Sequence, residues 1–245
     1  MEKGQIKDYN IEGIIQFEGD YLDGERNGKG KEYNKDGKLE FEGEYFNGIR
    51  KGKGKEYLDD NLIFEGEYLD GKRNGKGKEY NKDGNIIFEG EYFNGQKKGQ
   101  GKEFDKNGDL KFEGEYLNGE RNGKGKEYYK EEGMKFEGEF KNGEINGKGK
   151  EYYNGNIRFI GEYYDGKRSG KGKEYSEYGE IEFEGEYSEG EKNGEGKEYQ
   201  DGKLIFEGEY LNGERNGTGK EYLDGKIEFE GQYLNGKRVR EEGDI

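Results

Sequence analysis

The sequence predicts an all-β fold, an elongated single-layer antiparallel sheet made of tandem β-hairpins. Three observations predict this fold. The motif Phe-Glu-Gly-Glu-Tyr and close variants of it return every 23 or 24 residues. Around each motif apolar and polar residues alternate, which is typical of a strand with one buried face. The chain contains 49 Gly and no Pro or Ala, so it favours strands and Gly turns over helices.

The repeats fill almost the whole chain and divide it into three parts. Ten copies begin at Phe17, Phe41, Phe64, Phe88, Phe112, Phe136, Phe159, Phe183, Phe206 and Phe229. Residues 1–16 resemble the second half of a copy, residues 17–236 hold the copies, and residues 237–245 form a tail. We therefore expect an N-terminal cap, a hairpin array and a C-terminal tail, because stacked arrays have atypical terminal repeats.

The first strand of each copy has two chemically different faces. In Leu39–Tyr45, the Leu, Phe, Gly and Tyr side chains fall on one face and three Glu side chains fall on the other. A turn with Asx-Gly steps follows, as in Leu22–Gly28. The first strand therefore contributes an aromatic stripe to one face of the sheet.

The second strand returns as Gly-Lys-Gly-Lys-Glu-Tyr over 28–33. Matching of opposite charges predicts neighbours on the outer face, namely Lys29 and Lys31 beside Glu18 and Asp20. Gly28 and Gly30 would then lie on the aromatic face, where a missing Cβ leaves room for a ring. The face occupied by Tyr33 depends on whether a β-bulge occurs near Glu32.

The repeat at Phe112–Tyr128 resembles the MORN repeat, whose pattern is aromatic-x-Gly-x-aromatic-x-x-Gly-x-x-x-Gly-x-Gly. The resemblance extends from Phe17 to Gly236, with Phe at 104 and 140 in place of Tyr and Ile160 in place of Glu. It implies a scaffold that binds partner proteins along an aromatic groove, sometimes dimerises, and in some members contacts membrane phosphoinositides.

Composition argues against several kinds of chemistry. The chain has no His and no Cys, which removes Ser-His-Asp and Cys-His catalysis and the commonest zinc ligands. Paired carboxylates recur in nearly every copy, whereas catalysis needs one special constellation. We therefore expect no enzymatic activity, no cofactor and no metal site.

The aromatic stripe has two interpretations: it is the packing face of the sheet, or it packs and also binds a partner. The candidate partner-binding residues are Phe41, Tyr45, Phe64, Tyr68, Phe88, Tyr92, Phe112, Tyr116, Phe136, Phe140, Phe159, Tyr163, Phe183, Tyr187, Phe206 and Tyr210.

A row of basic residues recurs at the first turn of each copy. It contains Arg26, Arg50, Arg73, Arg121, Arg168 and Arg215, with Lys97, Ile145, Lys192 and Arg238 at the other corresponding positions. Stacked copies would align them into a basic edge for phosphates or acidic lipids. The net charge of -15 disfavours both phospholipid membranes and nucleic acid.

Our leading hypothesis is a cytoplasmic, non-enzymatic scaffold that binds a partner protein along the aromatic groove, peripheral to a membrane or the cytoskeleton in some settings. The alternatives are phosphoinositide binding through the basic edge and a bacterial antitoxin or immunity protein. The terminal strand edges at Lys7–Ile14 and Phe229–Leu234 are expected to allow a homodimer. Departures from the motif, such as Ile145 and Ile160, are the first places to seek a specific site.

Overall fold

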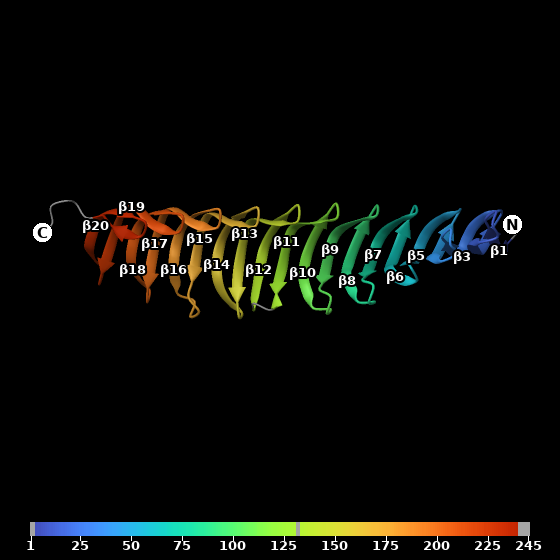
Figure 1. Ribbon diagram of the computed structural model, residues 1–245, viewed down its shortest axis with the longest axis horizontal. Helices are drawn as coiled ribbons and strands as arrows, with labels where there is room; N and C mark the ends of the chain where they lie inside the picture. The colour runs from blue at the N-terminus through green and yellow to red at the C-terminus, as the bar shows by residue number, and fades with distance from the viewer. Residues whose placement is uncertain (1–2, 131–132, 240–245) are drawn as a thin grey trace. The chain divides into compact units, whose positions relative to one another are not determined.

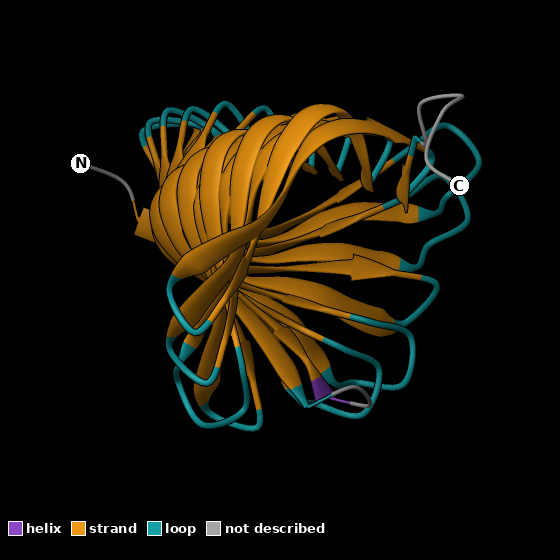
Figure 2. Ribbon diagram, turned by 90° about the vertical axis from the view of Figure 1, so that its left-hand side faces the viewer, coloured by secondary structure: helices purple, strands orange, loops and turns teal. Residues whose placement is uncertain are grey.

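The fold was obtained as a computed structural model, which describes residues 3–130 and 133–239. The chain divides into two compact units, Met1–Arg121 and Asn122–Ile245, and each is described by itself. Strands and connecting loops make up almost all of both units, and a short 3-10 turn at Lys130 has the helix colour in Figure 2; no α-helix occurs among the described residues.

Unit 1 is a run of antiparallel strands in which each strand pairs with the next along the chain (Figure 1). Its strands are β1 (Lys3–Tyr9), β2 (Ile15–Leu22), β3 (Glu25–Tyr33), β4 (Leu39–Phe46), β5 (Ile49–Leu58), β6 (Asn61–Leu69), β7 (Lys72–Tyr80), β8 (Ile86–Phe93), β9 (Gln96–Phe104) and β10 (Leu110–Leu117). From β2 onward, each repeat is one hairpin.

Unit 2 repeats the same arrangement. Strand β11 (Glu120–Tyr129) carries the unit boundary, and it is followed by β12 (Met134–Lys141), β13 (Glu144–Tyr153), β14 (Asn156–Tyr164), β15 (Lys167–Tyr175), β16 (Ile181–Ser188), β17 (Glu191–Gln200), β18 (Lys203–Leu211), β19 (Glu214–Leu223), β20 (Lys226–Leu234) and β21 (Lys237–Arg238). The predicted all-β, single-layer sheet of tandem hairpins is confirmed within each unit.

The register of the strands follows the charges on the outer face, the face opposite the Phe rings. Glu18 pairs with Lys31, and Lys31 in turn pairs with Glu42 of the next hairpin. Acidic and basic side chains therefore alternate from strand to strand, and opposite charges directly across a strand pair stabilise that register. The predicted proximity of Lys31 and Glu18 is confirmed.

A typical repeat, such as the one that begins at Phe17, carries two β-bulges that redirect side chains. The first lies between Gly19 and Tyr21, opposite Gly28, which has a φ of 115°. A Cβ on Gly28 would meet the Asp20 side chain, so the prediction that Gly28 lies on the aromatic face is wrong. The Asp20 carboxylate occupies that place because it accepts the Lys29 backbone N–H at 3.0 Å.

The second bulge lies between Glu32 and Tyr33, where β3 pairs with β4. It leaves Tyr33 on the outer face, where its hydroxyl donates to Glu18 at 2.8 Å. Burial and this acidic neighbour raise the pKa of Tyr33 to about 12. The second-strand Tyr is therefore an outer-face residue that links neighbouring strands.

The core is one layer of aromatic rings lying on glycine backbone. Nine Phe side chains are at most 2% exposed, and the Tyr side chains of the stripe from Tyr45 onward are nearly as buried. The Phe41 ring rests against Gly43 and Gly54, where any Cβ would collide with it. Phe41 also packs edge to face on Tyr45 and Tyr68, with centroid distances of 5.7 and 5.1 Å. Each such ring pair stabilises the fold by about 0.5–1.5 kcal/mol beyond the contribution of the apolar area that it buries.

Neighbouring hairpins are also joined at their turns. The Gly48 N–H donates to the Arg26 carbonyl of the preceding hairpin at 2.9 Å. The same bond to the preceding hairpin is made by Gly71, Gly95, Gly119, Gly166, Gly190, Gly213 and Gly236. Gly48 has a φ of 79°, a conformation that Gly adopts without strain. The turn glycine therefore closes its own hairpin through its positive φ and bonds to the preceding hairpin through its N–H.

Candidate binding face

The inner face, which carries the Phe rings, is covered by cationic side chains. Arg26 lies with its guanidinium carbon 4.0 Å from the Phe17 ring centroid. Equivalent contacts of 3.9–4.6 Å join Arg50 to Phe41, Arg73 to Phe64, Lys97 to Phe88, Arg121 to Phe112, Arg168 to Phe159, Lys192 to Phe183, Arg215 to Phe206 and Arg238 to Phe229. Such cation–π contacts are worth about 0.5–2 kcal/mol, depending on how dry they are.

Carboxylates from the second strands hold these cations in place. Glu56 accepts from the Arg73 guanidinium at 2.5 Å and from the Tyr68 hydroxyl at 2.6 Å. Arg73 also reaches Glu79 of its own hairpin at 3.4 Å. Arg73 and Glu56 are only 23% and 20% exposed. One guanidinium therefore links two hairpins through half-buried, charge-assisted hydrogen bonds.

We call this row of alternating cations and carboxylates the inner charge ladder. In unit 1 it consists of Arg26, Glu32, Arg50, Glu56, Arg73, Glu79, Lys97, Glu103 and Arg121, and in unit 2 of Glu151, Arg168, Glu174, Lys192, Glu198, Arg215, Glu221 and Arg238. Its regularity follows from the hairpin repeat.

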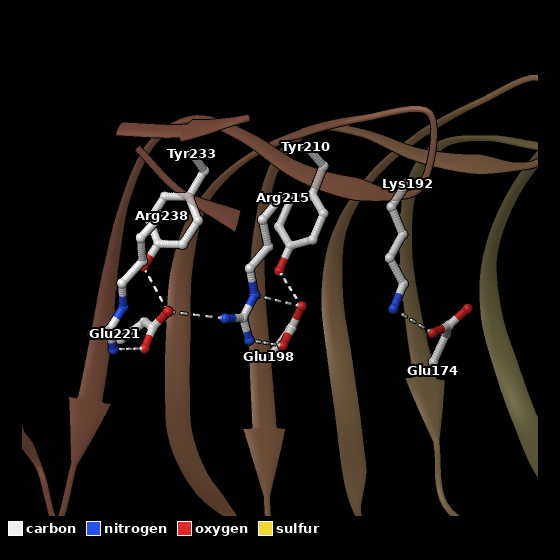
Figure 3. A network of polar contacts seen from close by, with 8 residues as sticks. All are labelled: Glu174, Lys192, Glu198, Tyr210, Arg215, Glu221, Tyr233 and Arg238. Atoms are coloured by element: carbon white, nitrogen blue, oxygen red, sulfur yellow. Dashed lines mark hydrogen bonds and ion pairs between the residues drawn. The ribbon is translucent and has the colours of Figure 1, made fainter. Parts of the chain in front are cut away.

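Figure 3 shows the ladder in unit 2, with Arg215 between two carboxylates. Arg215 forms an ion pair with Glu198 and another with Glu221 at 3.3 Å. The hydroxyls of Tyr210 and Tyr233 donate to the same two carboxylates at 2.7 Å each. Every carboxylate drawn here thus has a cation, and two of the three also have a Tyr hydroxyl.

The protonation behaviour of Glu198 reflects these partners. Burial alone would raise the pKa of Glu198, but the hydrogen bonds from Arg215 and Tyr210 and the nearby positive charges outweigh it and hold the pKa below the ordinary value. Glu56 and Glu103 show the same balance. These three carboxylates are therefore ionised at neutral pH.

The structure places the predicted site residues differently from the expected open groove. The sixteen stripe residues are buried side chains of the core, so a partner on this face would touch the ladder above the rings. The six arginines expected at a basic edge bend over the Phe rings and pair with Glu. The physical reason is that a guanidinium on a ring face beside a carboxylate is more favourably placed than one at an open turn.

Sequence reasoning missed the ladder carboxylates, although the sequence carried a signal for them. Glu32 stands two residues after Gly30, so the two residues share a face by strand alternation. Gly30 was already expected on the aromatic face. The same parity applied to Glu32 would have placed a carboxylate beside the rings and within reach of the Arg side chains.

The inner ladder is interrupted in one repeat by two coordinated replacements. Phe140 takes the place of the stripe Tyr, and its cross-strand neighbour is Ile145 in place of Arg. The hydroxyl and the guanidinium are thus lost together, which leaves an apolar step instead of an unpaired charge. On the outer face, Ile160 lies between Lys150 and Lys173, where other repeats place Glu.

Neither a metal site nor a membrane-spanning helix is visible in the part of the chain that the structure describes. No group of three or more Asp and Glu side chains there is arranged to hold a metal ion. No helix within residues 3–130 and 133–239 is long and apolar enough to cross a membrane.

An open hollow on the outer face of unit 1 is lined by Phe46, Leu69, Lys51 and Glu44, among others.

Comparison with known proteins identifies the repeat. A family model described as the MORN repeat matches residues 17–38, 41–62, 64–86, 88–110, 112–134, 136–157, 159–177, 183–203 and 206–225. No curated protein matches the chain. A solved structure described as "Crystal Structure of TcdB2-TccC3-TEV" is 14% identical over 90% of this chain and 13% of its own, with a TM-score of 0.22. The chain thus spans a small part of that protein, and a likeness this weak carries no argument.

Proposed function

Because this chain belongs to the MORN-repeat family, we propose that it is a non-enzymatic scaffold that binds a partner protein along the inner charge ladder. MORN repeats indicate a repeat-based binding or scaffold role in general, and the family is generally non-enzymatic. The proposal adds the face, the residues and the chemistry of the partner to that general role.

The observation that supports the inner face is the repetition of one partly exposed charge pattern from hairpin to hairpin. In Arg168 and Glu151 the side chains are 26% and 18% exposed, so their outer atoms are accessible to a partner. Charges of both signs alternate, which suits a polypeptide that carries acidic and basic side chains in turn. Such complementarity supplies specificity and register, whereas the buried rings supply rigidity.

A pair of charge swaps tests this proposal without removing any ring. Exchanging the inner pair, Glu198→Arg with Arg215→Glu, keeps an ion pair between the two positions but reverses its direction on the proposed contact face and puts the new carboxylate beside Glu221. The matched control exchanges an outer pair, Lys173→Glu with Glu184→Lys, whose charges lie 2.8 Å apart. We expect the inner swap to lower partner recovery in a pull-down read by mass spectrometry, while the outer swap leaves it unchanged.

Far-UV circular dichroism and urea unfolding serve as the folding control, in which both double variants should keep the hairpin array. Truncating the rings would not serve this purpose, because Tyr45 and Tyr68 are core side chains. Loss of the same partners from the outer swap, or equal recovery by all three proteins, would show that the inner ladder is not the contact face.

A further inference from the structure

The second strand of a hairpin must have Gly at one inner-face position, because the Phe ring of that hairpin lies directly on the backbone there. A Cβ at this position would come closer than 3.0 Å to the ring carbon Cζ, which real Cβ atoms essentially never do. The glycines concerned are Gly30, Gly54, Gly77, Gly101, Gly149, Gly172, Gly196 and Gly219. A strand can therefore occupy the second-strand side of a Phe-bearing first strand only if it presents Gly at that position.

Strand β1 is a second strand by its register but breaks this rule. Asp8 pairs with Phe17 as Glu32 pairs with Phe41 in the next repeat, and the Tyr21 hydroxyl donates to Asp8. Ile6 pairs with Gly19, so it stands at the required Gly position. The Ile6 side chain is 41% exposed, and among the described residues β1 pairs with β2 alone.

Strand β20 presents the complementary half of a hairpin. It pairs with β19 along one side, but on its other side the described pairing with β21 reaches only Tyr233 and Leu234. Phe229 is accordingly half-buried, whereas the Phe side chains that begin the nine preceding repeats are at most 2% exposed. Among the described residues, no second strand covers the Phe229 ring.

The backbone of β20 is directed so that this side can accept a strand. The Gln232 carbonyl accepts from the Val239 N–H at 2.7 Å, so Gln232 points its backbone groups toward the β21 side. Backbone direction alternates along a strand, so Glu230 points the same way. No residue in 3–130 or 133–239 is paired with the Glu230 N–H or carbonyl on this side, so both groups can bond to an added strand.

The edges of β20 and β1 would match if two copies of the chain met end to end. The hairpin register Phe41–Glu56, Glu42–Lys55 and Gly43–Gly54 would be reproduced by Phe229–Asp8, Glu230–Lys7 and Gly231–Ile6. Phe229 would pair with the acidic Asp8, as Phe41 pairs with Glu56, and Glu230 would pair with the basic Lys7, as Glu42 pairs with Lys55. Only Ile6 does not fit, because its side chain falls where the Phe229 ring must lie.

We propose that Ile6 is a stop residue, which prevents β20 of one copy from pairing with β1 of a second copy. Such head-to-tail pairing is heterologous and does not close on itself, so it would otherwise build filaments. Placing one bulky side chain on an otherwise compatible edge is a means of protecting strand edges from unwanted association. The same rule leaves the β20 edge open to a strand that has Gly opposite Gly231.

Sedimentation velocity of the full chain over a concentration series tests the proposal. The wild-type protein and the Ile6→Val variant should sediment as the same species, because Val also carries a Cβ. The Ile6→Gly variant should form larger species as concentration rises. Adding Glu230→Pro to Ile6→Gly should abolish them, because Pro removes the N–H that faces the added strand. Association of the wild type that Glu230→Pro abolishes, or no association of Ile6→Gly, would overturn the proposal.

A peptide experiment keeps the test valid if Ile6→Gly loosens β1. A labelled peptide with the β3 sequence, Glu25–Tyr33, is titrated with the wild-type chain and compared with the same peptide carrying Gly30→Ile. We expect the Gly peptide to bind at least about tenfold more tightly, since Ile would have to displace a packed ring. Equal affinities of the two peptides would overturn the glycine rule and with it the role of Ile6.

Discussion

At the scale of single residues, each repeat is organised around a Phe ring with different chemistry on its two sides. The Phe64 ring has the glycine backbone of Gly66 and Gly77 on one side and the Arg73 guanidinium, 4.0 Å from its centroid, on the other. Glycine gives the ring a flat surface, and the cation covers it without a second layer of protein. This explains how a chain with only 27% hydrophobic residues builds a buried core.

Replacing one of these glycines should be costly. Gly54→Ala places a methyl group on the Phe41 ring, so we expect the free energy of unfolding to fall by about 2 kcal/mol or more. Gly4→Ala is the matched control, because nothing lies within 4 Å of a Cβ there. Urea denaturation of both variants measures the difference. Equal losses would show that the ring does not lie on the Gly54 backbone.

The Glu198 carboxylate should make the stability of the fold depend on acid pH in a defined direction. The pKa of Glu198 is lowered in the folded chain, so its contribution to stability is present above the ordinary Glu pKa of 4.5 and is lost as pH falls through the folded value. We expect Glu198→Gln to be less stable than wild type at pH 7, with the gap shrinking below pH about 4.5. Urea midpoints measured across this range give the gap. A gap that widens on acidification would contradict the assignment.

At the scale of the hairpin, the turns combine a left-handed Asx residue with Gly. Asp201 has a φ of 50° and is followed by Gly202 at 72°, and Asp224 and Gly225 repeat this arrangement. The turn between β5 and β6 instead has Asp at both positions, and Asp60 has a φ of 66°. A residue with a Cβ carries a strain there that Gly does not.

A reciprocal exchange should expose that strain. We expect Asp60→Gly to raise the free energy of unfolding by about 1 kcal/mol, and Gly202→Asp to lower it by a similar amount. Both turns join a second strand to the next first strand, so each variant serves as the control for the other. Thermal and urea unfolding give the two changes. Effects of the same sign would mean that the backbone conformation does not control these turns.

At the scale of the whole molecule, the repeat made the fold predictable and concealed the site. The alternation around Phe41 was sufficient to predict hairpins, and the charges of Glu18 and Lys31 were sufficient to predict the outer register. The bulge between Gly19 and Tyr21 was not predictable, because it depends on how the Asp20 carboxylate accepts a backbone N–H, and the bulge near Glu32 was only one of two alternatives. Without them, the turn arginines could not be placed over the rings, so the inner ladder emerged only from the structure.

The central claim is that partners contact the inner charge ladder. Carboxylate footprinting by mass spectrometry, on the full chain with and without a partner recovered by pull-down, tests it most directly. We predict that the partner lowers labelling of Glu56, Glu103 and Glu198 and leaves the outer carboxylates Glu42, Glu65 and Glu207 unchanged, because only the first set belongs to the ladder. Protection confined to the outer set would contradict the claim.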